Sequence, residues 1–445
     1  MLRHICDANI KKVSIKCNVN HLDFRLTFYK FEDTNLRKMH KEHVDVLIIG
    51  AGPSGAVAAG ILEKSGLNIK IIEKEKFPRF VIGESLIPRV MDHFDEAGFM
   101  DDLNAQGFEK KFGARFLRGN EVCWFDFSEQ FTKGWSWTWQ MPRAEFDHTL
   151  AQSLIKRGVP LEFETAVTDI QFEGTSSVTT VVDKEGNTKQ IHAKFVIDSS
   201  GYGRVLPRLL DLDKPSTFEP MAATFTHVKD VRRPNNQDST LITFDVLSQK
   251  VWFWVIPFSN GNTSLGLVCP KEYFESIVKE NPTETFNAII QKSDYYKERF
   301  GGLPFLFEPK QLVSYAKAVK KLYGPGFALT GNSAEFLDPV FSSGVCFATE
   351  SGSLSAKLAL RQIRGEEVDW QVEYEDHIMS GVNVFRSYIR DWYSGDLQKF
   401  FFHPEVNQDI RTKVCSVLAG YVWDKTNPFV KKHDYAVRAV TQMLP

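Results

Sequence analysis

Apolar residues in this chain gather in short runs separated by glycine turns and polar segments. Residues 44–49 form a mostly apolar, β-branched run, which is typical of a strand buried on both faces. Small and apolar residues over 56–64 then predict a helix, and residues 68–72 predict a second strand. A strand, a helix and a strand in this order predict a parallel α/β unit.

The turn that joins the first strand to the helix has the sequence G-A-G-P-S-G. Its first glycine permits a tight turn, its second lets the backbone approach a pyrophosphate, and its third allows close packing of helix and strand. The N-terminus of the helix offers free N–H groups to phosphates, and an acid at the end of the second strand can bind ribose hydroxyls. The unit therefore predicts a dinucleotide site that contains Gly50, Gly52, Pro53, Ser54, Gly55 and Glu73.

The later part of the chain predicts a different architecture. Residues 221–228, 240–246, 251–256 and 263–268 are predicted strands of an antiparallel sheet, and the alternation over 252–257 fits a half-buried strand. A long helix is predicted from Val345 to about Ile363, and the tail after 366 is predicted to be helical. The first 40 residues have no clear period, so they predict either a flexible extension or an upstream start.

Composition limits the classes of function. The 445 residues suggest two or three structural units, and a net charge of -2 gives no reason to expect nucleic acid or anionic lipid. The 36 phenylalanines and 9 tryptophans suit a large apolar pocket, or equally a bulky core. The six cysteines have neither C-x-x-C nor zinc spacing, which favours reduced thiols in a cytoplasmic protein and no metal site. No apolar run approaches the ~20 residues of a membrane span.

Several segments resemble one known enzyme family. The sequence R-F-V-I-G-E-S-L-I-P over 79–88 resembles a stretch of flavin-dependent halogenases that lies against the flavin. M-P-R-A-E-F-D over 141–147 is similar to the segment that opens a long helix in those enzymes and in related flavin hydroxylases. W-F-W-V-I-P over 252–257 and D-P-V-F-S-S-G over 338–344 also resemble signatures of the halogenases.

The resemblance implies that the dinucleotide is FAD and adds further residues to its site. Asn332 stands where the family has the aspartate of G-D-A, and its amide can still bond a ribityl hydroxyl. The amides near Ser343 and Gly344 are expected either to hold an anion, chloride in halogenases, or only to contact the flavin ring. The cofactor residues added by the resemblance are Gly83, Ser85, Arg143, Asp198, Asn332, Pro339, Ser343 and Gly344.

The resemblance also implies a domain plan. The fold class is α/β, with a Rossmann-like FAD-binding domain of the two-dinucleotide-binding type and an inserted antiparallel substrate domain. We expect a flexible extension over 1–42, a discontinuous FAD-binding domain over 43–214 and 318–365, a substrate domain over 215–317 and a helical C-terminal cap over 366–445.

One position breaks the family pattern and leaves the chemistry open. Phenol- and pyrrole-acting halogenases carry an active-site lysine before I-G-E-S, where this chain has Val81. Lys74 and Lys76 lie nearby in sequence but are predicted to be solvated, so the catalytic residue is unknown. Oxygen insertion through reduced flavin ranks first, as hydroxylation or a halogenase-like reaction. The alternatives are hydride transfer as in geranylgeranyl-reductase-like enzymes, halogenation by another relay, and a non-catalytic flavoprotein.

Partners follow from the same reasoning. The substrate is expected to be a small aromatic or apolar molecule, either free or attached to a carrier. No second G-x-G-x-x-G for a nicotinamide is seen. The resemblance implies that a separate flavin reductase supplies the electrons.

Overall fold

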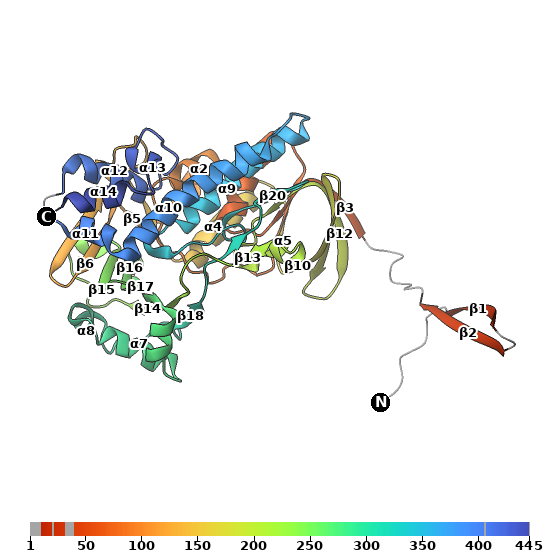
Figure 1. Ribbon diagram of the computed structural model, residues 1–445, viewed down its shortest axis with the longest axis horizontal. Coiled ribbons are helices and arrows are strands. Elements are labelled where there is room, and N and C mark those ends of the chain that lie inside the picture. Colours follow the sequence, from red (N-terminus) through yellow and green to blue (C-terminus); the bar gives the residue numbers. More distant parts are fainter. Residues whose placement is uncertain (1–9, 20–21, 32–39, 405, 445) are drawn as a thin grey trace.

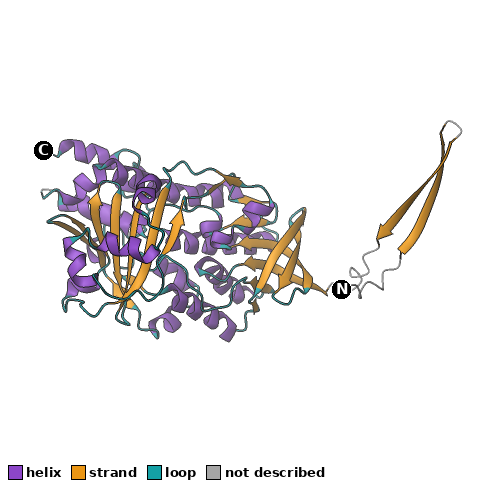
Figure 2. Cartoon of the chain, turned by 90° about the horizontal axis from the view of Figure 1, so that it is seen from below, coloured by secondary structure: helices purple, strands orange, loops and turns teal. Residues whose placement is uncertain are grey.

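Two β-sheets form the body of the chain, and the C-terminal helices lie beside them (Figure 1). The computed structural model describes residues 10–19, 22–31, 40–404 and 406–444. One sheet has eight strands and the other has seven. Figure 2 shows the two groups of strands side by side, with helices around both.

The eight-stranded sheet has a parallel centre, as the opening strand–helix–strand pattern predicts. β3 (His40–Ile49) lies between β12 (Thr188–Asp198) and β4 (Ile69–Ile72), and all three run parallel. The first strand begins four residues earlier than the apolar run that predicts it. The remaining strands are β9 (Leu161–Glu162) and β21 (Phe327–Leu329), which are parallel to their neighbours, and β10 (Thr165–Glu173), β11 (Ser176–Asp183) and β20 (Tyr323–Gly324), which are antiparallel.

Two helices pack closely against each other and against this sheet because glycines bring their backbones together. They are α1 (Pro53–Leu62) and α9 (Gly344–Ile363). A Cβ on Gly352 of α9 would lie 2.4 Å from the Ser54 carbonyl oxygen of α1. A Cβ on Gly55 would lie 2.0 Å from the Gly50 carbonyl oxygen. Side chains at either position would force α1 away from its neighbours.

The seven-stranded sheet contains the four strands predicted between residues 221 and 268. Its order is β18-β14-β17-β16-β15-β6-β7. Two of its strands, β6 and β7, come from residues 113–126, which sequence reasoning assigned to the FAD-binding domain. The seven-stranded sheet is therefore not confined to residues 215–317. Its strands are β6 (Gly113–Arg118), β7 (Glu121–Asp126), β14 (Met221–Lys229), β15 (Thr243–Ser248), β16 (Val251–Pro257), β17 (Asn262–Pro270) and β18 (Lys310–Val313).

Strand β16 is buried on both faces, so the prediction of a half-buried strand is wrong. Trp252, Trp254 and Ile256 belong to the main apolar core. Val251, Phe253 and Val255 point the other way, into a second apolar cluster. That cluster includes residues of α6 (Lys271–Ile277), α7 (Pro282–Ile290) and α8 (Asp294–Phe300), which cover this face of the sheet.

The tail after residue 366 is helical, as predicted. A π-helical segment, Trp370–Asp376, leads into α10 (His377–Ser394), the longest helix of this region. The others are α11 (Asp396–Phe402), α12 (Gln408–Leu418), α13 (Pro428–Lys431) and α14 (Ala436–Met443). Phe400 and Phe401 of α11 are buried and pack in the core, and Phe401 contacts Phe116 and Phe125 of the seven-stranded sheet.

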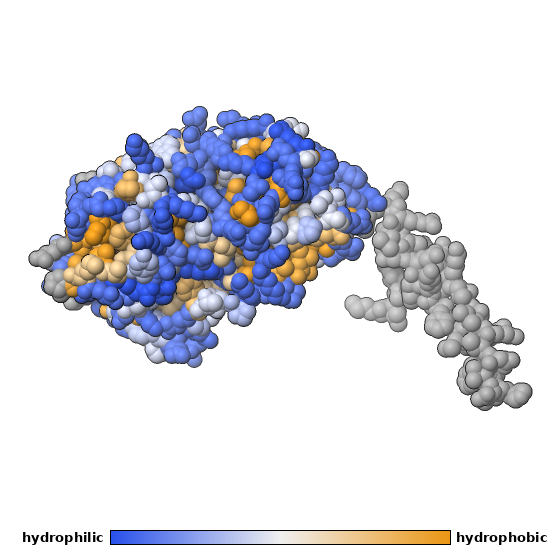
Figure 3. Space-filling view, turned by 45° about the horizontal axis from the view of Figure 1, so that its top comes forward, coloured by the Kyte–Doolittle hydropathy of each residue, from blue (hydrophilic) through white to orange (hydrophobic). Residues whose placement is uncertain are grey.

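Short elements connect these layers. They are α2 (Val90–Glu96), α3 (Met100–Asn104), β5 (Glu109–Lys111), β8 (Thr138–Gln140), α4 (Arg143–Lys156), α5 (Val205–Leu209), β13 (Asp213–Lys214) and β19 (Ala318–Val319). Hydrophilic residues dominate the face drawn in Figure 3, with smaller hydrophobic patches between them.

The first 42 residues contain an antiparallel hairpin that the sequence analysis did not predict. It pairs β1 (Ile10–Val19) with β2 (Leu22–Phe31). Leu22, Phe24, Leu26 and Phe28 alternate with other residues, and this alternation is the signal that was missed. The rest of the predicted flexible extension, up to residue 39, lies outside the described residues. Among the helices of the described chain, none is long and apolar enough to cross a membrane.

Candidate functional site

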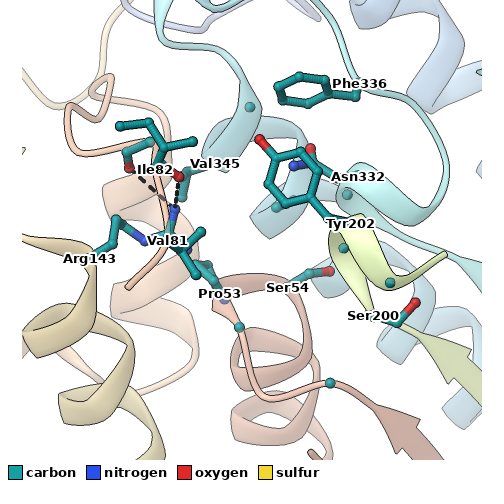
Figure 4. A pocket seen from close by; sticks show the side chains of 18 of the residues that line it. Pro53, Ser54, Val81, Ile82, Arg143, Ser200, Tyr202, Asn332, Phe336 and Val345 are labelled. Atoms are coloured by element: carbon teal, nitrogen blue, oxygen red, sulfur yellow. Dashed lines mark hydrogen bonds between the residues drawn. The ribbon is translucent and has the colours of Figure 1, made fainter. Parts of the chain in front are cut away.

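A cavity of about 850 Å³ lies where the carboxyl ends of β3, β4 and β12 meet the seven-stranded sheet. Residues from α1, from the 79–85 loop, from α4 and from the segment before α9 surround it (Figure 4). Most of the residues predicted from sequence line this cavity. They are Gly50, Gly52, Pro53, Ser54, Glu73, Val81, Gly83, Ser85, Arg143, Asn332, Pro339 and Gly344.

The glycine turn is built as the dinucleotide pattern requires. Gly50 has a φ of 100°, and a Cβ there would lie 2.5 Å from the Ser199 carbonyl oxygen. Gly52 is the N-cap of α1. Apart from its chain neighbours, the only described atom within 4 Å of its Cβ position is Arg79 Nη2, at 3.8 Å. The backbone at Gly52 therefore faces open cavity, next to the positive end of a helix, where a pyrophosphate can bind.

The Glu73 carboxylate is buried, and its hydrogen bonds join this turn to the end of β4. Its Oε2 accepts a hydrogen bond of 2.9 Å from the Ala51 amide, and its Oε1 accepts one of 2.8 Å from the Glu75 amide. A carboxylate oxygen can accept more than one hydrogen bond, so both oxygens can still receive ribose hydroxyls from the cavity.

Three hydroxyl groups join separate segments at the floor of the cavity. Ser54 Oγ donates to Thr330 Oγ1 at 2.7 Å, and Ser199 Oγ lies 2.8 Å from the same atom. These residues come from α1, from the end of β12 and from the end of β21. The sequence analysis singled out Ser54 alone among the three.

Arg143 opens α4 and holds the loop that carries Val81. Its Nε donates to Asp147 Oδ1 at 2.8 Å, and its Nη1 donates to the Ile82 and Gly83 carbonyls at 3.3 Å each (Figure 4). Arg79 donates to the other oxygen of Asp147, also at 2.8 Å. Because the Asp147 carboxylate is fully buried, this ion-pair cluster fixes the loop, and both arginines keep part of their surface in the cavity wall.

The segment before α9 supplies a further wall. Ser342 has a φ of 56°. No described atom outside its own helix and chain neighbours lies within 4 Å of the Cβ position of Gly344. The start of this 20-residue helix therefore faces the cavity with its backbone exposed. The side chain of Asn332 is half-buried and lies nearby, among Tyr202, Phe336 and Val345 (Figure 4).

Three of the predicted cofactor residues do not line the cavity. Gly55 acts through packing, as described above. Ser343 is 1% exposed and sits at the N-cap of α9, behind Ser342 and Gly344. Asp198 is fully buried, and its carboxylate accepts the amides of Ser200 and Leu206 at 2.9 and 2.7 Å. Burial raises the pKa of Asp198. This residue holds the turn after β12, and its side chain lies outside the cavity lining.

The part of the cavity beside the seven-stranded sheet is apolar. Phe225, Phe244, Trp252, Trp254 and Ile256 line it, and all five side chains are buried. These residues come from β14, β15 and β16 of this sheet, and the tryptophans belong to the W-x-W-x-I-P signature. A flat or bulky apolar molecule fits such a surface.

Two lysines lie in the wall, and neither replaces the missing family lysine at Val81. Lys74 lines the cavity and is exposed to solvent, as predicted. Lys310 was not singled out from sequence. Its Nζ lies 4.1 Å from the centre of the Phe80 ring, and its side chain is also exposed. Among the described residues, no group of three or more His, Cys, Asp or Glu side chains is arranged to hold a metal ion.

This geometry agrees with a match to a known protein family. The model of the FAD binding domain family matches residues 43–294, more than half of the chain. The chain belongs to this family.

Members with known names and structures extend the match. A solved structure titled flavoprotein/dehydrogenase, from Cytophaga hutchinsonii, is 54% identical and covers 91% of this chain and 99% of its own, with a TM-score of 0.89. A 1H-pyrrole-2-carbonyl-(peptidyl-carrier protein) brominase from Pseudoalteromonas luteoviolacea is 29% identical over 85% of this chain and 92% of its own length. The structure of a flavin-dependent brominase is 28% identical over 90% of this chain and 98% of its own, with a TM-score of 0.78. The resemblance to flavin-dependent halogenases is confirmed.

The cavity of this FAD binding domain protein fits its cofactor. FAD needs a site for two phosphates, an acceptor for ribose hydroxyls and a slot for a flat ring. The open backbone at Gly52, the buried Glu73 carboxylate and the space between the 81–83 loop and Gly344 supply these three features. The prediction of FAD as cofactor is confirmed, and the chain is an FAD-dependent oxidoreductase of the halogenase-like kind.

Removal of the Glu73 carboxylate should weaken FAD binding without abolishing it. We expect Glu73→Ala to cost about 1–3 kcal/mol, the range for hydrogen bonds to a charged group, or about 5- to 150-fold in Kd. Titration of the apoprotein with FAD, followed by flavin fluorescence, measures this change. Glu73→Gln keeps the size of the side chain and should give a smaller loss. An unchanged Kd in Glu73→Ala would remove Glu73 from the site.

Proposed function

We propose that this protein oxidises an aromatic or apolar substrate with oxygen through reduced FAD, in the manner of a flavin monooxygenase. The observation that carries this proposal is a valine, Val81, in the wall of a cavity whose other end is lined by aromatic side chains. Valine has no group that can donate a hydrogen bond to a hypohalous acid or form a haloamine. The lysine-directed route of the halogenases is therefore not open to this chain, while the apolar compartment is retained.

The cofactor residues have distinct proposed roles. Gly50, Gly52, Pro53, Ser54 and the N-terminus of α1 hold the pyrophosphate, Glu73 holds the ribose, and Asn332 bonds the ribityl chain. Gly83, Ser85 and Arg143 shape one side of the ring site, and Pro339 and Gly344 shape the other. When bound, FAD supplies the redox chemistry; the protein excludes water and presents the substrate. The backbone near Gly344 either holds an anion or contacts the ring only.

The proposed domain plan follows from these roles. The eight-stranded sheet with α1 and α9 is the Rossmann-like FAD-binding part, built from residues 43–214 and 318–365 without the β6–β7 pair. The seven-stranded sheet is the substrate part, inserted between them, and the C-terminal helices form the cap. The parallel order β12-β3-β4 and the glycine turn after β3 support this assignment.

Electrons are proposed to come from a separate flavin reductase, and the protein is proposed to be cytoplasmic. The brominase relative acts on a pyrrole attached to a carrier protein, as its name states, so a carrier-attached substrate is also within this proposal. Steady oxidation of NAD(P)H by the pure protein would contradict the need for a separate reductase.

A second candidate function is hydride transfer without oxygen insertion. The structure that shares 54% identity with this chain is titled flavoprotein/dehydrogenase. The same apolar compartment can hold an alkene or another hydride acceptor or donor, so the two functions differ in the fate of the reduced flavin and not in the shape of the cavity.

Rapid mixing of the anaerobically reduced holoprotein with oxygen distinguishes these functions. For an oxygen-using enzyme we expect a spectral species distinct from both reduced and oxidised flavin, with a decay that does not depend on chloride or bromide. Direct reoxidation without such a species would favour hydride transfer. Val81→Lys is the matched variant. If Val81 alone blocks the halogenase route, halide should alter the decay of the spectral species in this variant. The variant should then also halogenate an activated phenol. Halide dependence in the unmodified protein would overturn the proposal.

A further inference from the structure

A buried carboxylate, Asp338, lies just outside the cavity, between the cavity residues Leu337 and Pro339. It is 3% exposed and is the first residue of the D-P-V-F-S-S-G segment. Its Oδ2 accepts hydrogen bonds from the hydroxyls of Tyr315 and Tyr393, each at 2.9 Å. Its Oδ1 accepts the Val340 amide at 3.1 Å. The carboxylate is therefore held by three donors from three segments.

The same network reaches the W-x-W-x-I-P signature. The indole N–H of Trp252 donates to the Tyr393 hydroxyl at 3.0 Å. Tyr393 belongs to α10, so this bond ties the C-terminal helices to strand β16. Trp252 and Tyr315 both line the cavity, while Asp338 does not. The hydrogen bonds thus run from the cavity through Tyr315 to Asp338, and from Asp338 through Tyr393 back to a cavity residue.

Tyr315 is the member of this network that can meet a substrate. Within the described chain, Asp338 is its only hydrogen-bond partner, and its O–H is committed to that carboxylate. A phenolic oxygen that donates its proton keeps acceptor capacity. The Tyr315 oxygen can therefore accept a hydrogen bond from a hydroxyl that enters the apolar compartment.

Asp338 is the group of this cluster that changes charge nearest to neutral pH. Burial raises its pKa to about 6, although the hydrogen bonds from the two tyrosines and Val340 act in the opposite direction. The other titratable groups around it are Tyr315, Tyr393 and the Cys269 thiol. Burial raises the pKa of both tyrosines well above 10 and that of Cys269 to about 12. These three groups stay neutral while Asp338 gains or loses its proton.

We propose that Tyr315 and Asp338 form a proton-accepting pair that ionises a phenolic substrate in the apolar compartment. The substrate O–H bond breaks as its proton moves to the Tyr315 oxygen, and the Tyr315 proton moves to Asp338 Oδ2. The electron pair of the broken bond stays on the substrate oxygen, which becomes a phenolate, and Asp338 becomes neutral. Tyr393 and Trp252 are positioning residues that hold the carboxylate in place.

This inference rests on the proposed function and narrows its substrate class to ring hydroxyl compounds. A phenolate ring is richer in electrons than a phenol ring and reacts more readily with an oxidant. The inference also gives a reason for the position of the Trp252 indole. Its N–H donates to the Tyr393 hydroxyl, and that hydroxyl donates to Asp338.

Binding of 4-nitrophenol to the oxidised holoprotein tests the pair without any turnover. The phenol and phenolate forms of this probe have different absorption spectra, and difference spectra against the holoprotein separate them from the flavin. Below the pKa of the free probe, we expect the unmodified protein to bind part of it as phenolate. Because Asp338 takes the proton, the probe should ionise without releasing one proton to the buffer for each phenolate formed. A pH indicator in the solution measures any such release.

Variants assign the effect to named groups. We expect Tyr315→Phe and Asp338→Asn each to lower the bound phenolate fraction at least 10-fold. Tyr393→Phe keeps Asp338 but removes one bond that stabilises its charge, so the carboxylate should take the proton more readily and the phenolate fraction should rise. Tyr323→Phe is the matched control, because its hydroxyl contacts Gln371 and does not line the cavity; it should leave the fraction unchanged.

Several outcomes would overturn the pair. They are failure of 4-nitrophenol to bind, binding of the neutral form by the unmodified protein, a phenolate fraction unaffected by Tyr315→Phe, or release of one proton to the buffer for each phenolate formed. The methyl ether 4-nitroanisole, which has no proton to give, reports whether the compartment takes the ring at all. None of these results depends on the reaction of reduced flavin with oxygen, so failure of the pair and failure of the proposed function are distinguishable.

Discussion

Replacement of Gly52 by valine is expected to abolish FAD retention while the chain still folds. The backbone at Gly52 has φ -69° and ψ -177°, an extended conformation open to any residue. Among described atoms beyond its chain neighbours, its Cβ would meet only Arg79 Nη2, at an ordinary contact distance of 3.8 Å. The valine side chain would therefore fill cavity space in front of α1 and exclude the pyrophosphate. Loss of a pair of hydrogen bonds to a charged group costs about 3 kcal/mol, so Kd should rise at least ~100-fold.

The neighbouring glycine provides the contrast that makes this test specific. Gly50→Ala should destabilise the fold itself, because the φ of 100° disfavours a side chain and the new Cβ would lie 2.5 Å from a backbone oxygen. Flavin absorbance after purification, together with circular dichroism of each variant, measures the two effects separately. A Gly52→Val protein that purifies with full flavin occupancy would show that the pyrophosphate binds elsewhere.

Local patterns in the sequence predicted the parts of the fold and site that depend on neighbouring residues. The apolar runs at 44–49 and 69–72, the glycine turn between them and the long helix from residue 344 all lie where the pattern predicts them, within a few residues. Each is determined by a period or by a backbone requirement within about 20 residues. Most of the predicted cofactor residues line one cavity because the carboxyl ends of parallel strands meet at one edge of a sheet.

The features that sequence reasoning missed depend on partners far along the chain. β6 joins the seven-stranded sheet by parallel pairing with β15, which lies more than 120 residues later, and nothing local to residues 113–118 indicates this partner. The family resemblance added Asp198 to the cofactor residues, and only the folded chain shows that its carboxylate accepts the backbone amides of Ser200 and Leu206. Asp338 and Tyr393 are 55 residues apart, and only the docking of α10 brings them together.

A buried lysine illustrates the same limit and leads to a second large expected effect. Lys111 follows Glu109 and Lys110, so it looks like one residue of a solvated charged run, yet it is 1% exposed. Its Nζ donates to Ser85 Oγ at 2.9 Å and to the Leu86 carbonyl at 2.7 Å. In the described part of the chain no carboxylate pairs with it, and burial lowers its pKa from 10.5 to about 7.

The stability of the protein should therefore rise as the pH is raised from 7 to 9. In this range the unfolded chain keeps a proton on Lys111, since its pKa there is 10.5, while the folded chain has largely lost it. The state that binds more protons is favoured by acid, and here that is the unfolded state. The free energy of unfolding therefore increases as the pH rises. For this one group the gain amounts to at most about 3 kcal/mol between pH 7 and pH 9.

Urea unfolding of the holoprotein at both pH values, with FAD in fixed excess, measures this gain against Lys111→Met. Methionine has a similar length and no charge. The free energy of unfolding of this variant should therefore lose the increase between pH 7 and pH 9 that Lys111 causes, even though the Leu86 carbonyl is left without a donor. Lys110→Met is the control, because Lys110 is exposed and its Nζ lies over the Trp137 ring at 4.7 Å; it should respond to pH as the unmodified protein does. An identical pH response in Lys111→Met would mean that Lys111 keeps its proton in the folded chain. The Lys111 amine would then be a permanent cation that is hydrogen-bonded to Ser85, a residue of the cavity lining.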